Sequence, residues 1–174
     1  MQATTDLLLE HPIDDVTHRL IAEVTGLNHG YITRHFGTQN GLFIAVASEL
    51  QNRIIAQTLV EGGLRLSTLG QMQLPEAQLR LKLVLWLIDH GASREDFAAD
   101  TALVVNLISA HLRLRPGLSE KAARIYAYRV LLGMQSLMLL SEMHGIDDEL
   151  REELLLLGTR EMERSLDTTR SLGW

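Results

Sequence analysis

The apolar residues of this chain recur every three to four positions along most of its length, which is the spacing of amphipathic α-helices. Between residues 13 and 43 the apolar stretches are short and glycines separate them. After residue 74 they are long, and the stretch over 75–90 is apolar on nearly all sides, as in a helix at the centre of a bundle. No alternating apolar pattern indicates a strand. The pattern predicts an all-α protein of about eight helices, with an N-terminal three-helix head and a C-terminal helical bundle.

The head begins with a helix over residues 3–10, which ends before Pro12 because the residue ahead of a proline is disfavoured in helical geometry. A short second helix follows Thr17, whose hydroxyl suits the N-cap position. Gly26 fits the left-handed position at the end of this helix, and Leu27 is expected to fold back behind it. The inner face of the second helix is formed by Leu20, Ile21 and Val24.

A third helix is predicted over His29–Phe36, because Asn28 is another good N-cap only two residues after Gly26. Ile32 and Phe36 lie four residues apart and form its inner face. Two short helices joined by a turn of three or four residues that contains glycine make a helix-turn-helix. The second helix of that motif fits the major groove of DNA. The stretch therefore predicts a head that reads DNA.

The remaining helices are longer and begin at recognisable N-terminal signals. Pro75 suits a first helical position, Ser93 and Asp96 have the spacing of a capping box, and Ser119 is a good N-cap. Gly145 indicates the end of another helix. Helices are predicted over residues 38–60, 75–90, 93–115, 119–144 and 147–170, and residues 62–74 are predicted to form a loop.

The spaced residues of the head resemble the N-terminal domain of the tetracycline-repressor (TetR) family. The matching pieces are Thr17-x-x-x-Ile21-Ala22, Gly26-Leu27-Asn28, Gly30-x-Ile32-x-Arg34-His35-Phe36-Gly37 and Gly41-Leu42-Phe43. The resemblance covers residues 3–50 in sequence, and beyond them it is one of helical layout alone. It implies a helix-turn-helix DNA-binding domain over residues 1–50 and a ligand-binding and dimerisation domain over residues 51–174. It also implies a transcriptional repressor that a small, largely apolar ligand releases from its operator DNA.

The resemblance and the predicted geometry together give a set of DNA-binding residues. Side chains that the core does not need should face the groove, where Arg34 suits the edge of a guanine. Thr33 or Tyr31 would contact a base edge, a thymine methyl group or a phosphate. Thr33 stands where tyrosine is commonest in the family, Gln39 where lysine is commonest and His29 where lysine is frequent. The full set is Thr17, His18, Asn28, His29, Gly30, Tyr31, Thr33, Arg34, His35 and Gln39.

The charge of the chain argues against simple coating of DNA. The net charge is −6, and in residues 1–50 two bases, Arg19 and Arg34, stand against six acids, which leaves −4. Neutralisation of phosphates supplies most non-specific DNA affinity. The head therefore binds weakly, contacts phosphates through backbone N–H groups and helix dipoles, or has lost DNA binding. In the last case the protein would be a ligand- or partner-binding protein that keeps the fold.

Four of the seven histidines lie in the head, at positions 11, 18, 29 and 35. No metal site is expected, because their spacing does not place two ligands on one helix face and no cysteine or acidic partner accompanies them. His35 is expected to pack under the head. Protonation near pH 6 would add positive charge toward DNA, which gives the hypothesis that DNA affinity rises as the pH falls from about 7.5 to about 6.

The best ligand-binding candidates in the body combine apolar walls with a few polar groups, as small-molecule sites do. Each of them also fits an ordinary core position, because methionine fills irregular space and a lone histidine commonly satisfies one hydrogen bond. The ligand is expected to be apolar or amphipathic, and its identity stays open. The candidates are Trp86, His90, Asn106, His111, Met134 and Met138.

The helix over residues 119–144 carries more apolar surface than one intramolecular face can bury. Gly133 within it and Gly158 in the next helix would let helices approach closely. A symmetric homodimer through helices at about 119–144 and 147–170 would bury the excess in a four-helix bundle. The operator would then be palindromic, with half-sites ~34 Å apart. The alternative is a monomer in which these helices are fully interior.

Several other classes of protein are not indicated. Without cysteine the chain forms neither disulfides nor thiolate metal sites, which is compatible with the reducing cytoplasm. Its N-terminus lacks the pattern of a signal peptide, and its apolar runs are too short for a membrane span. It contains no Gly-x-Ser-x-Gly, glycine-rich phosphate loop or Glu-x-x-His motif. We therefore expect a cytoplasmic protein that is not an enzyme, has no cofactor and does not associate with membranes.

Overall fold

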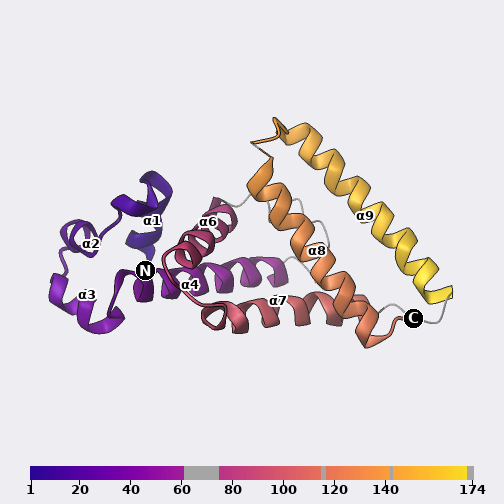
Figure 1. Ribbon diagram of the computed structural model, residues 1–174, viewed down its shortest axis with the longest axis horizontal. Coiled ribbons are helices and arrows are strands. Elements are labelled where there is room, and N and C mark those ends of the chain that lie inside the picture. The colour runs from indigo at the N-terminus through magenta and orange to yellow at the C-terminus, as the bar shows by residue number, and fades with distance from the viewer. Residues whose placement is uncertain (61–74, 115–116, 142, 172–174) are drawn as a thin grey trace. The chain divides into compact units, whose positions relative to one another are not determined.

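The computed structural model describes residues 1–60, 75–114, 117–141 and 143–171, and the secondary structure of these residues is entirely helical (Figure 1). The predicted all-α class is thus confirmed. The loop predicted over residues 62–74 lies outside the described residues. The helices are α1 (Gln2–Glu10), α2 (His18–Thr25), α3 (His29–Phe36), α4 (Gln39–Val60), α6 (Pro75–Asp89), α7 (Glu95–Arg113), α8 (Glu120–Leu140) and α9 (Asp148–Ser171), with the 3₁₀ turn η1 (Ile13–Asp15) between α1 and α2.

The chain forms two compact units. The first combines Met1–Ala56 with Leu74–Ala98, and the second combines Gln57–Gln73 with Ala99–Trp174. The helix α6 thus belongs to the same unit as the three helices of the head. The boundary that the sequence suggests at residue 50 separates two functions and not two compact units, and it stays a prediction.

The core of the first unit is built around the first half of α4. Phe43, Val46 and Leu50 are completely buried there, and Leu83 and Leu87 of α6 join the same core. Burying each such side chain contributes about 1.5–3 kcal/mol. In addition, α1 packs against α2 and α6, and α2 packs against α3. The head is therefore held by a core that extends into α6.

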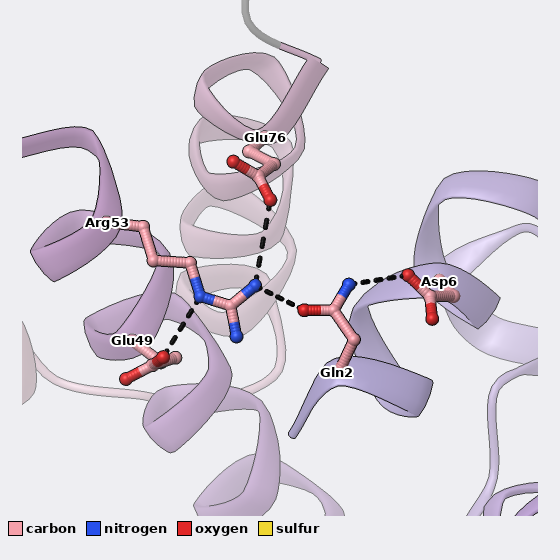
Figure 2. Close-up of polar contacts among 5 residues, drawn as sticks. All are labelled: Gln2, Asp6, Glu49, Arg53 and Glu76. Atoms are coloured by element: carbon pink, nitrogen blue, oxygen red, sulfur yellow. Dashed lines mark hydrogen bonds and ion pairs between the residues drawn. The ribbon is translucent and has the colours of Figure 1, made fainter. Parts of the chain in front are cut away.

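Arg53 of α4 joins three helices of the first unit (Figure 2). Its Nη1 donates to Gln2 Oε1 of α1 at 2.6 Å and lies 3.7 Å from Glu76 Oε1 of α6. Its Nε donates to Glu49 Oε1 at 3.0 Å, and Gln2 Nε2 donates in turn to Asp6 Oδ1 at 2.7 Å. A guanidinium presents several donors in one rigid plane, so this single side chain fixes α1, α4 and α6 against each other.

The second unit has its own core, formed by α7, α8 and α9. The Tyr126 hydroxyl of α8 and the Ser165 hydroxyl of α9 are 2.7 Å apart and share a hydrogen bond, which ties these two packed helices together. The core residues are Val105, Ile108, Leu112, Ala123, Tyr126, Ala127, Met162 and Leu166. None of the described helices is long and apolar enough to cross a membrane.

The helix α8 ends at Leu140, whereas the sequence predicts that it continues to His144. The Ser141 hydroxyl donates to the Leu137 carbonyl, and the Ser141 carbonyl accepts from the Ile146 N–H at 2.8 Å. The His144 N–H still bonds to the Leu140 carbonyl at 3.1 Å, and the bond from Ile146 then closes the turn. Gly145 follows with a positive φ of 65°, as its predicted role in the turn requires.

Candidate nucleic-acid interface

The two short helices α2 and α3 begin at the N-caps that the sequence predicts. The Thr17 hydroxyl accepts from the Leu20 N–H at 3.2 Å, and Asn28 Oδ1 accepts from the Gly30 N–H at 2.7 Å. Between them Gly26 ends α2 in the left-handed region, at φ 69°. Each cap satisfies a backbone donor of the first turn. The tight connection predicted between the two helices is confirmed.

The contact between α2 and α3 is narrower than predicted. Ile21 and Ile32 are buried in the core, but Val24 is 57% exposed and Leu27 is 51% exposed. The expected inward packing of Val24 and Leu27 is therefore wrong. The helix α2 ends at Thr25, so Val24 lies in its last turn, beyond the part that reaches the core.

The helix α3 is held closely at its other end. Gly41 of α4 sits so near the last residue of α3 that a Cβ at this position would overlap the Phe36 carbonyl oxygen. Glycine is therefore required for the close approach of α4 to α3. The recognition of Gly41 as part of a spaced motif thus has a steric basis in the structure.

The outward face of α3 is polar and aromatic. The rings of Tyr31 and His35 are stacked, with an interplanar angle of 2° and centroids 6.4 Å apart, and His35 also meets the Phe36 ring edge-on. The expectation that His35 packs under the head is wrong, because this side chain is exposed and lies against its neighbours on α3. The exposed predicted DNA-binding residues are Asn28, His29, Gly30, Tyr31, Thr33, Arg34 and His35.

The other three predicted DNA-binding residues are partly buried, and their polar atoms are engaged inside the head. The Thr17 hydroxyl caps α2, and Gln39 Nε2 donates to the Val16 carbonyl at 3.0 Å. His18 Nδ1 lies 3.5 Å from the Thr33 hydroxyl, across the gap between α2 and α3. These three side chains therefore connect parts of the helix-turn-helix to each other.

The surroundings of His18 disfavour its protonated form. Burial lowers the pKa of His18, and the neighbouring His29 imidazole lowers it further. Its Nε2 atom is buried and has no hydrogen-bond partner in the part of the chain that the structure describes. The hypothesis that acid pH adds charge toward DNA thus depends on the exposed His29 and His35. No group of three or more His, Cys, Asp or Glu side chains that could hold a metal ion occurs among the described residues.

The predicted ligand-binding residues belong to different units. Trp86 and His90 lie in the first unit, where the Trp86 Nε1–H donates to Asp14 Oδ1 at 2.8 Å. The other four candidates lie in the second unit. Asn106 is exposed there, and the half-buried ones are His111, Met134 and Met138. The pocket itself stays a prediction.

Comparison with known proteins agrees with the geometry of the head. Residues 1–46 match the family described as "Bacterial regulatory proteins, tetR family". The chain is 39% identical over 67 residues to the HTH-type transcriptional repressor AcnR of Corynebacterium efficiens, a match that covers 38% of this chain and 35% of that repressor. No solved structure matches the chain. Residues 1–46 thus form an N-terminal helix-turn-helix domain of the tetR family of bacterial regulatory proteins.

Proposed function

We propose that this protein is a DNA-binding transcriptional regulator, acting as a repressor, with α3 as its recognition helix. The observation that carries the proposal is the two-sided character of α3. Ile32 is 3% exposed and anchors the helix, whereas Tyr31 is 62% exposed and Arg34 lies on the exposed side with it. A helix anchored on one side and polar on the other is suited to a major groove.

Three side chains of α3 have distinct roles in this proposal. Arg34 donates two hydrogen bonds to a guanine edge, which is the commonest specific contact in protein–DNA complexes. Tyr31 and Thr33 contact a base edge, a thymine methyl group or a phosphate. Asn28 and Gly30 bring the backbone at the start of α3 close to the DNA, where helix N-termini attract phosphate.

A homodimer through α8 and α9 supplies the second head. Gly133 and Gly158 have open space where a Cβ would lie, so both positions allow a second helix to approach. Joining two copies across this apolar face would remove it from water and generate a palindromic operator with half-sites ~34 Å apart. Large apolar side chains exposed on these helices are Ile125, Tyr128, Leu132, Leu140, Leu150, Leu156 and Leu157.

An apolar or amphipathic effector would bind in the second unit and release the DNA. Half-buried His111, Met134 and Met138 offer adaptable walls and one polar group, and Asn106 adds an amide. An effector changes DNA binding only if it favours one conformation over the other, so it must bind more tightly to the state whose heads do not fit the operator.

DNA binding is tested with a fluorescently labelled fragment of the region upstream of the gene, at low salt. Arg34→Ala should weaken specific binding by about 1–3 kcal/mol and relax the preference for its base. Arg113→Ala is the matched control, because Arg113 is exposed on α7 in the second unit. Binding that ignores Arg34 would show that α3 is not the recognition helix. A folded dimer that binds no DNA would favour a ligand- or partner-binding protein, which the head charge of −4 suggests.

The dimer is tested separately by sedimentation velocity. Leu132→Glu places a charge on the exposed apolar face of α8 and should give monomers. Leu103→Glu, at an exposed leucine of α7, is the matched control and should leave the dimer intact. A wild-type protein that sediments as a monomer at micromolar concentration would refute this part of the proposal.

A further inference from the structure

The C-terminal end of α6 is bonded to both sides of the helix-turn-helix. Trp86 Nε1–H donates at 2.8 Å to Asp14 Oδ1 in η1, three residues before the N-cap of α2. Asn40, in the first turn of α4 after α3, donates its Nδ2 to the His90 carbonyl at 2.8 Å. The pair α2–α3 is thus flanked by two hydrogen bonds, one to Trp86 in the last turn of α6 and one to His90 directly after that helix.

Trp86 is firmly seated at this point. The indole meets the ring of Phe43 in an edge-on arrangement, with centroids 5.4 Å apart, and Phe43 is completely buried. The indole also stacks on the His90 ring, with centroids 3.7 Å apart and an interplanar angle of 14°. The Asp14 side chain is 73% exposed, so water would satisfy it without Trp86. The bond to Trp86 therefore fixes the position of η1 and is not needed to satisfy a buried acid.

The protonation state of His90 bears directly on this contact. Its Nδ1 is 2.7 Å from the Trp86 carbonyl, and a carbonyl only accepts, so Nδ1 carries the proton. In the neutral ring Nε2 is then an acceptor, and it faces Asp14 Oδ1 at 3.9 Å. Protonation places an N–H and a positive charge there, beside the carboxylate and against the indole face.

Among the described residues, Asp14 is the charged group that lies nearest to the His90 ring. Asp14 approaches from η1, while Asn40 approaches from α4 and is neutral. Asp89 is an exposed neighbour on α6 itself, and Arg94 is exposed in the segment that follows. Protonation of His90 is therefore expected to tighten its contact with Asp14.

We propose that Trp86 and His90 are positioning residues that set the place of α2 and α3 through Asp14, and that protonation of His90 strengthens this hold. The inference rests on the proposed DNA binding for its functional readout. It gives these two side chains a task in the first unit, in place of the ligand-binding role predicted from the sequence.

The first experiment measures DNA affinity by fluorescence anisotropy between about pH 5.5 and 7.5. Trp86→Phe keeps the ring and removes the N–H, and should weaken binding about two- to tenfold, as expected for one lost hydrogen bond. Asp14→Asn should lose a similar factor, and the double variant should lose no more than the larger single effect, because both remove the same contact. The DNA affinity of the His90→Gln variant should increase less than that of wild type when the pH is lowered. His144→Gln, an exposed histidine in the second unit, should follow wild type.

The second experiment needs no DNA, so it separates failure of this inference from failure of the proposed function. With Trp174→Phe as background, Trp86 is the remaining tryptophan, and its emission should fall as His90 becomes charged. Asp14→Asn should also change the Trp86 emission at a fixed neutral pH, because the indole N–H loses its carboxylate acceptor. The inference is overturned if Asp14→Asn leaves the Trp86 emission unchanged. It is also overturned if the loss of DNA affinity tracks thermal stability and the pH profile of affinity does not change.

Discussion

Replacing Arg53 by methionine should destabilise the first compact unit, because it removes the guanidinium that joins α1, α4 and α6. Methionine keeps a similar length of apolar stem. The Arg53 side chain is 27% exposed, so its contacts are only partly screened by water. The contact with Gln2 at 2.6 Å is the shortest of its bonds, and those with Glu49 and Glu76 are ion pairs.

The magnitude follows from these three contacts. An ion pair four residues apart on a helix, as with Glu49, contributes about 0.3–0.5 kcal/mol, and the longer pair with Glu76 about 0.2–1 kcal/mol. A partly exposed hydrogen bond from a charged donor, as to Gln2, adds about 1 kcal/mol. The variant should therefore lose about 2 kcal/mol. For a protein of this size, that corresponds to a melting temperature lower by about 4–8 °C.

Thermal unfolding followed by circular dichroism measures this loss. Raising the salt from about 0.05 M to about 0.5 M should narrow the gap between wild type and Arg53→Met, because salt screens the ion pairs but not the packing. Arg19→Met, at an exposed arginine of α2 in the same unit, is the matched control and should change the melting temperature little. Equal melting temperatures for wild type and Arg53→Met would refute the reasoning.

Three further predictions concern the head. Folding lowers the pKa of His18 below its ordinary 6.5. The folded head therefore binds fewer protons than the unfolded chain, and it loses stability as the pH falls from 6.5 toward the pKa of His18 in the folded head. His18→Gln should therefore melt with a weaker acid dependence than wild type, and parallel pH profiles would contradict this. Gly41→Ala should displace the end of α3 from Phe36 and weaken DNA binding at least tenfold, whereas unchanged affinity would show that α4 shifts without cost. With two arginines in each head, the log–log salt slope of DNA binding by a dimer should be no steeper than about −4, and a steeper slope would mean that basic residues outside the head contact DNA.

The local structure of the head was predictable because its signals are short-range. A cap such as Thr17 or Asn28 bonds a backbone N–H two or three residues away, so the sequence contains both partners side by side. The bounds of α3 follow directly from Asn28 and Gly37. The same periodicity overstated the inner face of α2, because spacing alone does not say where the neighbouring core ends, and Val24 lies beyond it.

The contacts that fix the head against α6 were not predictable, because their partners are far apart along the chain. Asp14 and Trp86 are separated by 72 residues, and nothing in the spacing of either residue indicates the other. A helix that is apolar on nearly all sides leaves open which neighbours its tryptophan meets. Gln39 presents the same difficulty, since its bond to the Val16 carbonyl spans the whole helix-turn-helix. The sequence shows that a glutamine stands where lysine is commonest in the family, but it does not show that the amide is bonded inside the head.

The acidic balance of the head does not describe the surface of α3. Three of its acids are engaged away from that helix: Asp6 accepts from Gln2, Asp14 accepts from Trp86 and Glu49 pairs with Arg53. The helix α3 itself contains no acid. At physiological salt, exposed charges farther than about 8 Å away are largely screened, so the potential at a DNA groove is set mainly by what lies next to it. The helix α3 itself supplies one arginine, two exposed histidines and a helix N-terminus. A head of this kind gains little from phosphates in general, and its affinity must come from the bases that α3 contacts.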